Sequence, residues 1–122
     1  MSKYKNRKVL HNGMVFDSKK ERDRWVELSL MQKAGQIKNL KRQVEYLLIP
    51  AQFGFVVGEN GKRKRVCLER ACNYVADFTY NKGGELIVED VKGGYKKGAH
   101  YSLFVIKRKL MLERFGIRVA EV

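Results

Sequence analysis

The stretch "NYVADFTYNKGGELIVEDVKGG", residues 73–94, predicts two β-strands joined by a turn at "NKGG". It carries three acidic residues, Asp77, Glu89 and Asp90, in or beside segments of high β propensity. Acidic residues are usually depleted from such segments. Lys92 follows them closely, so this hairpin concentrates charge where a simple structural strand would not.

The register of the hairpin decides which of these side chains meet. A connection of two or four residues, centred on Lys82 and Gly83, pairs Asp77 with Val88. A connection of odd length would instead pair Asp77 with Glu89, because a one-residue slip turns every side chain of a strand to the other face.

In the first register, three charged side chains share one face of the sheet. Partners across antiparallel strands point the same way, and so do residues two positions apart along one strand. Asp77, Asp90 and Lys92 would then form one cluster. Val91 would point to the opposite face, where we expect a core formed by Tyr74, Ala76 and Phe78.

Two carboxylates beside an ammonium group allow two interpretations. Carboxylate oxygens are ligands that Mg²⁺ prefers, and the ion keeps several waters that can face a phosphate substrate. Lys92 would then orient or help deprotonate the attacking water and offset charge on the scissile phosphate, which predicts phosphodiester hydrolysis. The alternative is an ion pair between Asp and Lys on a solvated sheet face, which contributes little to stability.

The rest of the chain predicts an α/β fold. "FDSKKERDRWVELSLMQKAG", residues 16–35, predicts a helix with Ser18 as its N-cap and Gly35 at its end. Strands are expected over residues 44–57, interrupted near Pro50, over residues 63–80 after a turn at "GENG", and over residues 85–92. A second helix over residues 100–115 and a last strand over residues 117–122 complete one domain, residues 1–122, with the order α, β, β, β, β, α, β.

The charge balance predicts a polyanionic partner. The 122 residues include 26 Lys and Arg against 13 Asp and Glu, a formal net charge of +13. Such an excess favours binding to nucleic acid. No segment is long and apolar enough to span a membrane, and "MSKYKNRK" at residues 1–8 has no apolar signal region after its charges. We therefore expect a cytoplasmic protein that does not associate with a membrane.

The hairpin also resembles a known signature. "AD" at residues 76–77 and "DVK" at residues 90–92, twelve residues after Asp77, resemble the motif of the PD-(D/E)XK nuclease superfamily, with Ala76 where the pattern often has proline. "YVADFTYNKGGELIVEDVKG" followed by "IKRKLM" is also similar to a family of short phage-encoded proteins assigned to that superfamily. The resemblance implies a restriction-endonuclease-like core with a mixed central sheet flanked by helices. It also implies DNA cleavage with Mg²⁺, or Mn²⁺ in its place, and for a phage protein a location in the host cytoplasm.

The resemblance assigns roles position by position. Asp77 and Asp90 would be metal ligands, with the Val91 carbonyl as a third. Lys92 would be the catalytic lysine. Glu21 would be the acidic residue of the first helix that completes the metal site in many members.

Glu21 also has a structural interpretation. "SKKE" at residues 18–21 is a capping box whether or not a metal is near. On a helical wheel, however, Glu21 falls in line with Trp25 and Leu28 and therefore faces inward, which is a costly place for an unpartnered carboxylate. The side chain can serve as a cap, as a metal ligand, or as both.

Further polar residues are candidates for contact with DNA. They lie in "RQVEY", in the basic run beside the "GENG" turn, in the glycine-flanked loop after Lys92 and in the second helix. These residues are Gln43, Lys62, Arg63, Lys64, Arg65, Lys96, Lys97, Lys107 and Lys109. For each of them a solvated surface side chain is the alternative.

Size and charge extend the resemblance to one group of nucleases. Small basic members of the superfamily that lack a recognition domain include homodimeric Holliday-junction resolvases. The resemblance therefore implies a structure-selective endonuclease that acts on branched DNA as a homodimer. The competing function is a non-catalytic DNA-binding or architectural protein that retains the nuclease fold.

Overall fold

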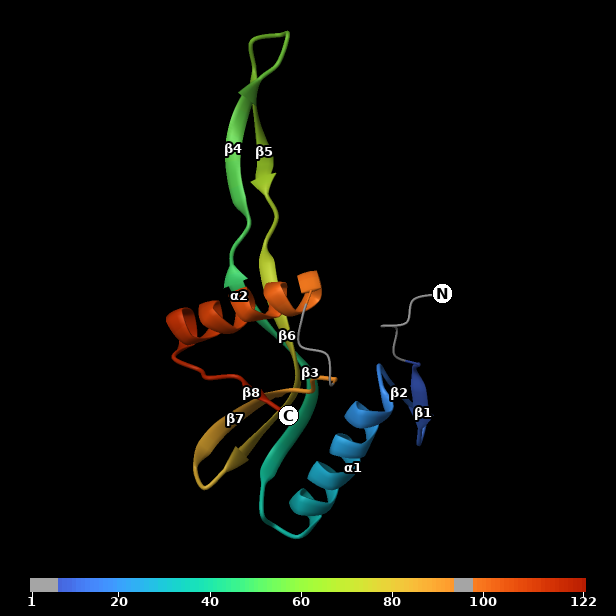
Figure 1. Ribbon diagram of the computed structural model, residues 1–122. Helices are drawn as coiled ribbons and strands as arrows, with labels where there is room; N and C mark the ends of the chain where they lie inside the picture. The colour runs from blue at the N-terminus through green and yellow to red at the C-terminus, as the bar shows by residue number, and fades with distance from the viewer. Residues whose placement is uncertain (1–6, 94–97) are drawn as a thin grey trace.

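The computed structural model describes residues 7–93 and 98–122, which form helices and strands around a four-stranded sheet (Figure 1). The helices are α1 (Lys19–Lys33) and α2 (Gly98–Phe115). The strands are β1 (Val9–His11), β2 (Met14–Phe16), β3 (Lys38–Ile49), β4 (Gln52–Val57), β5 (Arg63–Glu69), β6 (Cys72–Lys82), β7 (Glu85–Asp90) and β8 (Ala120–Glu121). Within these described ranges, neither helix combines the length and apolar character needed to cross a membrane.

The central sheet is mixed and has the strand order β3-β6-β7-β8. The first three strands pair antiparallel, whereas β8 lies parallel to β7 after the crossover through α2. The two helices cover opposite faces of the sheet, because Val88 packs in a cluster with α2 while its neighbour Ile87 packs in a cluster with α1. This arrangement confirms the expected α/β class.

The first helix begins and ends where the sequence predicts. Ser18 is the N-cap, and its Oγ accepts a hydrogen bond of 3.1 Å from the Glu21 backbone N–H. Gly35 follows the C-cap Ala34 with φ of 80°, a left-handed conformation that glycine adopts without steric cost. Leu28 is fully buried beneath the helix, as the helical wheel requires.

Two features of the strands differ from the expected order. The expected order omits the N-terminal hairpin of β1 and β2, which turns at Asn12 and Gly13 with φ of 49° and 78°. Asn-Gly is the strongest short hairpin signal, since both central residues of the turn need positive φ. In addition, β3 begins at Lys38 rather than at Val44, because its polar first half pairs with the end of β6.

The hairpin of β6 and β7 has a two-residue turn, but the turn lies one position later than expected. Lys82 pairs with Glu85 around Gly83 and Gly84, whose φ angles of 58° and 82° suit this tight connection. Thr79, not Asp77, is therefore the partner of Val88. The error shifts the register by two residues, an even number, so the predicted faces of Asp77 and Asp90 are unchanged.

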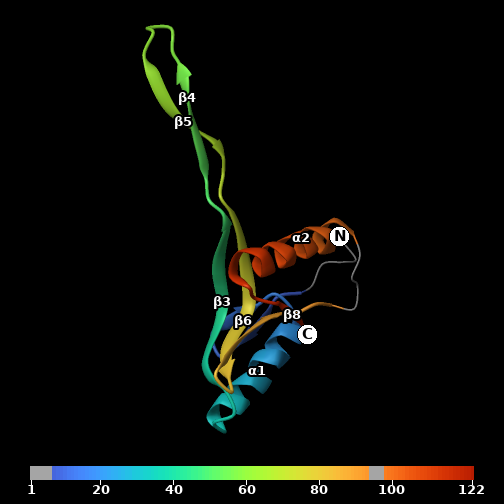
Figure 2. The same ribbon diagram turned by 90° about the vertical axis from the view of Figure 1, so that its left-hand side faces the viewer.

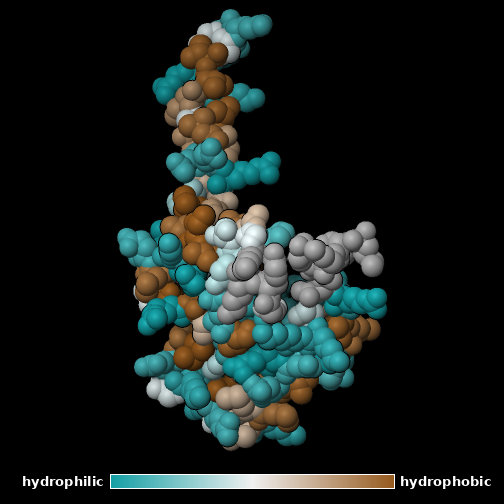
Figure 3. Space-filling view, in the orientation of Figure 1, coloured by the Kyte–Doolittle hydropathy of each residue, from teal (hydrophilic) through white to brown (hydrophobic). Residues whose placement is uncertain are grey.

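Beyond the sheet, β4 and β5 form a two-stranded arm, residues 52–69. The strands continue β3 and β6 past interruptions at residues 50–51 and 70–71, close to the predicted break at Pro50. Figures 1 and 2 show the arm projecting away from both helices, and Figure 3 shows that it stands clear of the body of the molecule. The predicted turn "GENG" is at its tip.

Candidate active site

The candidate site lies where β6 and β7 end their pairing. The last pair of their ladder is Phe78 with Glu89, so one further step brings Asp77 level with Asp90. The strands no longer pair there, and the Val91 backbone N–H instead donates a hydrogen bond of 2.7 Å to Asp77 Oδ2. The Asp77 side chain of β6 thus holds the backbone that follows β7 in place.

The side chains of β6 change faces at Asp77, which corrects the predicted core. Phe78 packs with α1 in the cluster that Val91 borders, as expected, but Tyr74 and Ala76 pack with α2 on the other face. Gln43 of β3 lies opposite Asp77 and has φ of 54°, a left-handed conformation that costs a non-glycine residue roughly 1–2 kcal/mol. A left-handed residue within a strand changes the direction of the side chains around it, and this one lies opposite Asp77.

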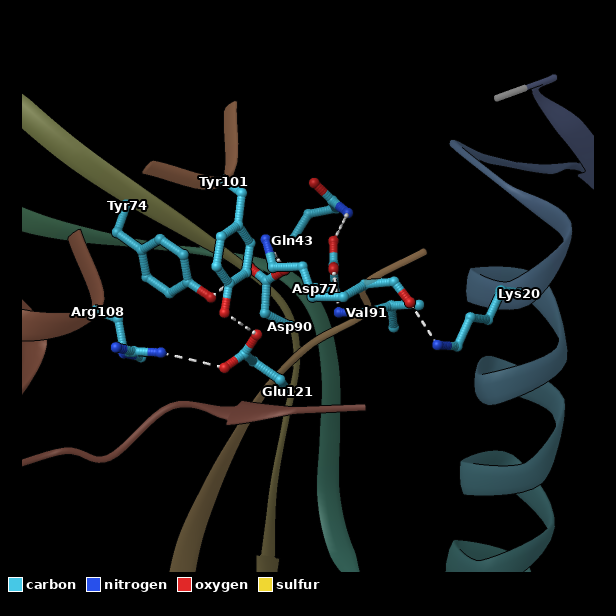
Figure 4. Close-up of polar contacts among 10 residues, drawn as sticks. Lys20, Gln43, Tyr74, Asp77, Asp90, Val91, Tyr101, Arg108 and Glu121 are labelled. Atoms are coloured by element: carbon cyan, nitrogen blue, oxygen red, sulfur yellow. Dashed lines mark hydrogen bonds and ion pairs between the residues drawn. The ribbon is translucent and has the colours of Figure 1, made fainter. Parts of the chain in front are cut away.

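Asp90, which Figure 4 shows beside Tyr74, forms the second part of the site together with Lys92. Lys92 Nζ lies 2.8 Å from Asp90 Oδ1, and the Tyr74 hydroxyl donates a hydrogen bond of 2.6 Å to Asp90 Oδ2. Burial and the Asp90 carboxylate both raise the pKa of Tyr74, so the phenol remains a donor. Lys92 Nζ also lies 3.5 Å from the centroid of the Phe104 ring of α2, which holds the ammonium by a cation–π contact.

Asp77 is a partly buried carboxylate with two other carboxylates, Asp90 and Glu21, near it. Burial, the largest cause, and the Asp90 carboxylate raise the pKa of Asp77 to about 7, while the Val91 N–H opposes them. Glu21 raises this pKa further. The Gln43 Nε2 amide lies between the two acids, 3.2 Å from Glu21 Oε1 and 3.5 Å from Asp77 Oδ1. One neutral amide therefore links two carboxylates.

Glu21 of α1 points toward Gln43 and the sheet, which agrees with its predicted inward position on the helix. The residue is 3% exposed, and burial together with the Asp17 carboxylate raises its pKa, while Arg42 lowers it. Arg42 Nη2 lies 3.6 Å from Glu21 Oε1. Lys20, next to Glu21, donates a hydrogen bond to the Lys92 carbonyl, so the first turn of α1 also contacts the "DVK" segment directly.

Glu121 is a fourth carboxylate of the site, beside Asp90, and the sequence did not reveal it. The parallel ladder pairs Asp90 with Glu121 of β8, and the Val122 N–H donates to the Asp90 carbonyl at 3.0 Å. Tyr101 and Arg108 of α2 bond the Glu121 carboxylate at 3.0 Å and 3.1 Å (Figure 4). Their spacing on the helix, together with Phe104, marks one face of α2, which is a signal that the sequence does contain.

Glu89 takes no part in this cluster, because its side chain lies on the face of the sheet that α1 covers. It is 2% exposed on the opposite face, where Arg24 donates to it through Nε, at 2.8 Å, and through Nη2, and the Tyr80 hydroxyl donates a third hydrogen bond. A buried carboxylate needs such partners, since an unpaired charge in the interior is costly. Glu89 therefore joins α1 to the sheet.

The other DNA-binding candidates are spread over the molecule. Lys62, Arg63, Lys64 and Arg65 are exposed on the arm, and Lys107 and Lys109 lie on α2 without a contact to the carboxylates in the described ranges. Lys96 and Lys97 lie outside the described residues. Of the candidates that the structure places, only Gln43 contacts the acidic cluster.

The donor set suits a hard cation that keeps some of its water. No three of the His, Cys, Asp and Glu residues in the described ranges are arranged to enclose a metal ion. Mg²⁺, however, is commonly held by one or two carboxylates with waters and phosphate oxygens completing its shell. Asp77 and Asp90 supply those two carboxylates. Burial, the largest cause, and the neighbouring Asp90 carboxylate raise the pKa of Asp77, and a bound cation would favour its charged form.

Comparison with known proteins adds a family but no activity. No curated protein matches the chain, and no solved structure matches it. One family model covers residues 1–119, which include every acidic residue of the site except Glu121. The chain therefore belongs to the family described as "Protein of unknown function (DUF1064)".

Proposed function

We propose that the chain is a Mg²⁺-dependent DNA endonuclease that hydrolyses phosphodiester bonds and selects DNA by its structure. The observation that carries the proposal is the convergence of Asp77, Asp90 and Lys92 at the point where β6 and β7 separate. The resemblance of these three positions to the PD-(D/E)XK motif and the formal charge of +13 support it independently. A restriction-endonuclease-like core is part of the same proposal.

The residues divide into metal ligands and substrate-facing groups. Asp77 and Asp90 would hold Mg²⁺, with the Val91 carbonyl and Glu21 completing the protein's share of the ligands. When bound, the ion would act as a Lewis acid on the scissile phosphate. The Val91 N–H and the Tyr74 hydroxyl fix the orientation of the two aspartates through bonds of 2.7 Å and 2.6 Å.

Lys92 would act on the attacking water and on the scissile phosphate. Water attacks phosphorus as the bond from phosphorus to a deoxyribose oxygen breaks, and negative charge grows on the phosphate oxygens. An ammonium paired with Asp90 has no lone pair with which to accept a proton. The geometry therefore favours orientation of the water and charge compensation over proton abstraction by Lys92.

Labelled DNA of defined structure tests this function. We expect purified protein to nick or cut at least one of duplex, flap, single-stranded and four-way substrates with Mg²⁺ or Mn²⁺, and none of them in EDTA. DNA that is retained in EDTA but stays intact after either metal is added would contradict the nuclease. That result would favour the architectural DNA-binding protein, which the net charge alone would also explain.

A homodimer is a further part of the proposal. Cutting both strands of a four-way junction needs two active sites, and two-fold symmetry places them on a two-fold substrate. We expect light scattering to show a dimer on a four-way junction. A monomer both free and on the junction would contradict resolution and leave a nickase or another monomeric endonuclease.

A further inference from the structure

The arm carries a face on which arginine and phenylalanine alternate. The ladder pairs Phe55 with Arg65 and Val57 with Arg63, so these side chains share one side of the ribbon with Phe53. The Arg63 guanidinium lies 4.3 Å from the Phe55 ring centroid, and the Arg65 guanidinium lies 3.8 Å from that of Phe53. Each arginine therefore lies over the phenylalanine diagonally opposite it.

These contacts prepare the arginines for an external anion. A guanidinium held over a ring has lost part of its side-chain freedom already, while the cation–π contact leaves its N–H groups able to donate hydrogen bonds. In the described part of the chain, neither Arg63 nor Arg65 has a carboxylate partner. Such a planar, unpaired donor matches the oxygens of a phosphate.

The rest of the arm favours a polyanion over a second copy of the chain. Residues 52–69 contain four basic residues against two acidic ones, and the whole chain has a charge of +13, so two copies would repel each other. Phe53 and Phe55 are 48% and 59% exposed as residues, yet an arginine guanidinium lies over the ring of each. This arrangement suits contact with the phosphate backbone better than stacking of single-stranded bases.

The length of the arm sets where this contact falls. Asp77 and Arg65 are twelve residues apart along β6 and β5, and a strand rises about 3.3 Å per residue, so they are separated by up to roughly 40 Å. One turn of duplex DNA is about 34–36 Å long. Figures 1 and 3 show that the arm extends away from the body without folding back on it.

We propose that the arm is a DNA-binding element that places Arg63 and Arg65 on backbone phosphates about one helical turn from the phosphate at the carboxylates. This inference rests on DNA as the substrate, as in the proposed function, but not on cleavage. If the arm binds DNA in this way, the chain contacts a longer stretch of duplex than the acidic site alone would contact.

Binding to a 24-base-pair duplex in EDTA, measured at several salt concentrations, tests the arm without any cleavage. Each phosphate contact contributes about 0.9 to the slope of log affinity against log salt. We expect Arg63→Gln/Arg65→Gln to reduce that slope by about two and to weaken affinity at least about tenfold at 0.1 M salt. Arg63→Lys/Arg65→Lys keeps the charge and should retain most of the slope.

A matched control removes the same charge elsewhere. Lys38 and Lys82 are exposed at the opposite end of the sheet from the arm, so Lys38→Ala/Lys82→Ala should leave affinity within about threefold and reduce the slope by less than one. On an eight-base-pair duplex, which is too short to span both contacts, the difference between wild type and the glutamine variant should shrink. Circular dichroism and thermal midpoints of all variants should match those of the wild type.

Two results would overturn the inference. The first is an affinity and a salt slope of Arg63→Gln/Arg65→Gln equal to those of the wild type. The second is a change in the variant's mass by light scattering without a change in DNA binding, which would assign the arm to contacts between copies. A wild type that binds through the arm but never cuts DNA would contradict only the proposed nuclease.

Discussion

Replacing Asp90 with asparagine is expected to abolish metal-dependent DNA cleavage while DNA binding in EDTA stays equal or becomes tighter. The substitution removes one of the two charges that would hold Mg²⁺, and it also removes a negative charge that faces phosphate. We expect a loss of at least about a thousandfold in turnover, which corresponds to roughly 4 kcal/mol of barrier. Binding and cleavage should therefore separate in one variant.

The groups around Asp90 can keep their hydrogen bonds in the Asp90→Asn variant, so the substitution should not disturb the fold. An asparagine has the same shape, and its amide oxygen can accept from the Lys92 ammonium that lies 2.8 Å from Asp90 Oδ1. The Tyr74 hydroxyl, which donates to the other carboxylate oxygen, can rotate to accept from the new amide. A thermal midpoint near that of the wild type is therefore expected alongside the lost activity.

Glu85→Gln is the matched control, because it makes the same chemical change on the same strand. Glu85 is exposed beside the turn at the other end of β7. This variant should cut DNA like the wild type. Cleavage at the wild-type rate by Asp90→Asn, in a preparation free of contaminating nuclease, would remove Asp90 from the site and with it the assignment of the motif.

The faces of the charged hairpin could be predicted, but its register could not. The alternation of side chains along a strand predicts Asp77 and Asp90 on the same face of the sheet. A register shift by an even number of residues leaves both side chains on that face. The position of the turn was uncertain because "NKGG" offers two glycines, and the pair Gly83 and Gly84 fits positive φ at both central positions better than Lys82 and Gly83. A residue pattern alone leaves such a choice open.

The reversal of faces at Asp77 has no signal in the local sequence. It coincides with the left-handed backbone of Gln43 on the neighbouring strand, a residue type that favours neither positive φ nor a bulge. The contacts of Gln43 with Glu21 and Asp77 come from two other elements, α1 and β6. Simple alternation therefore predicted Tyr74 and Ala76 correctly as core residues but placed them on the wrong face of the sheet.

Glu121 was missed because its neighbour in space is distant in the chain. The last strand was predicted, but nothing in "IRVAEV" indicates that it pairs parallel with β7, beside Asp90. Parallel pairing brings together residues separated by a whole helix, so it leaves no short-range pattern. The projection of the arm was missed for a related reason, since its strands look the same in sequence whether or not a sheet continues beside them.

Glu21→Gln is expected to lower cleavage by at least about a hundredfold and to raise the Mg²⁺ concentration that is required. Glutamine keeps an oxygen that can accept from the Gln43 amide, now 3.2 Å from Glu21 Oε1, but it removes the charge that Mg²⁺ favours. The helix cap should survive, because Ser18 Oγ accepts from the backbone of residue 21 and not from its side chain. Thermal melting should therefore change little.

Arg42 provides the control that separates a metal ligand from a structural partner. Arg42 Nη2 lies 3.6 Å from Glu21 Oε1, donates at 2.8 Å to the Val15 carbonyl and lies over Phe16, so Glu21 also helps to place this arginine. If Glu21 acts only through Arg42, then Arg42→Gln should reproduce the loss of cleavage, and the double variant should be no worse than either single one. We expect Arg42→Gln to keep most of the activity at saturating Mg²⁺. Should Glu21→Gln instead cut normally at limiting Mg²⁺, the Glu21 side chain is only a structural partner of Arg42 and Gln43, and Asp77, Asp90 and Lys92 form the site without it.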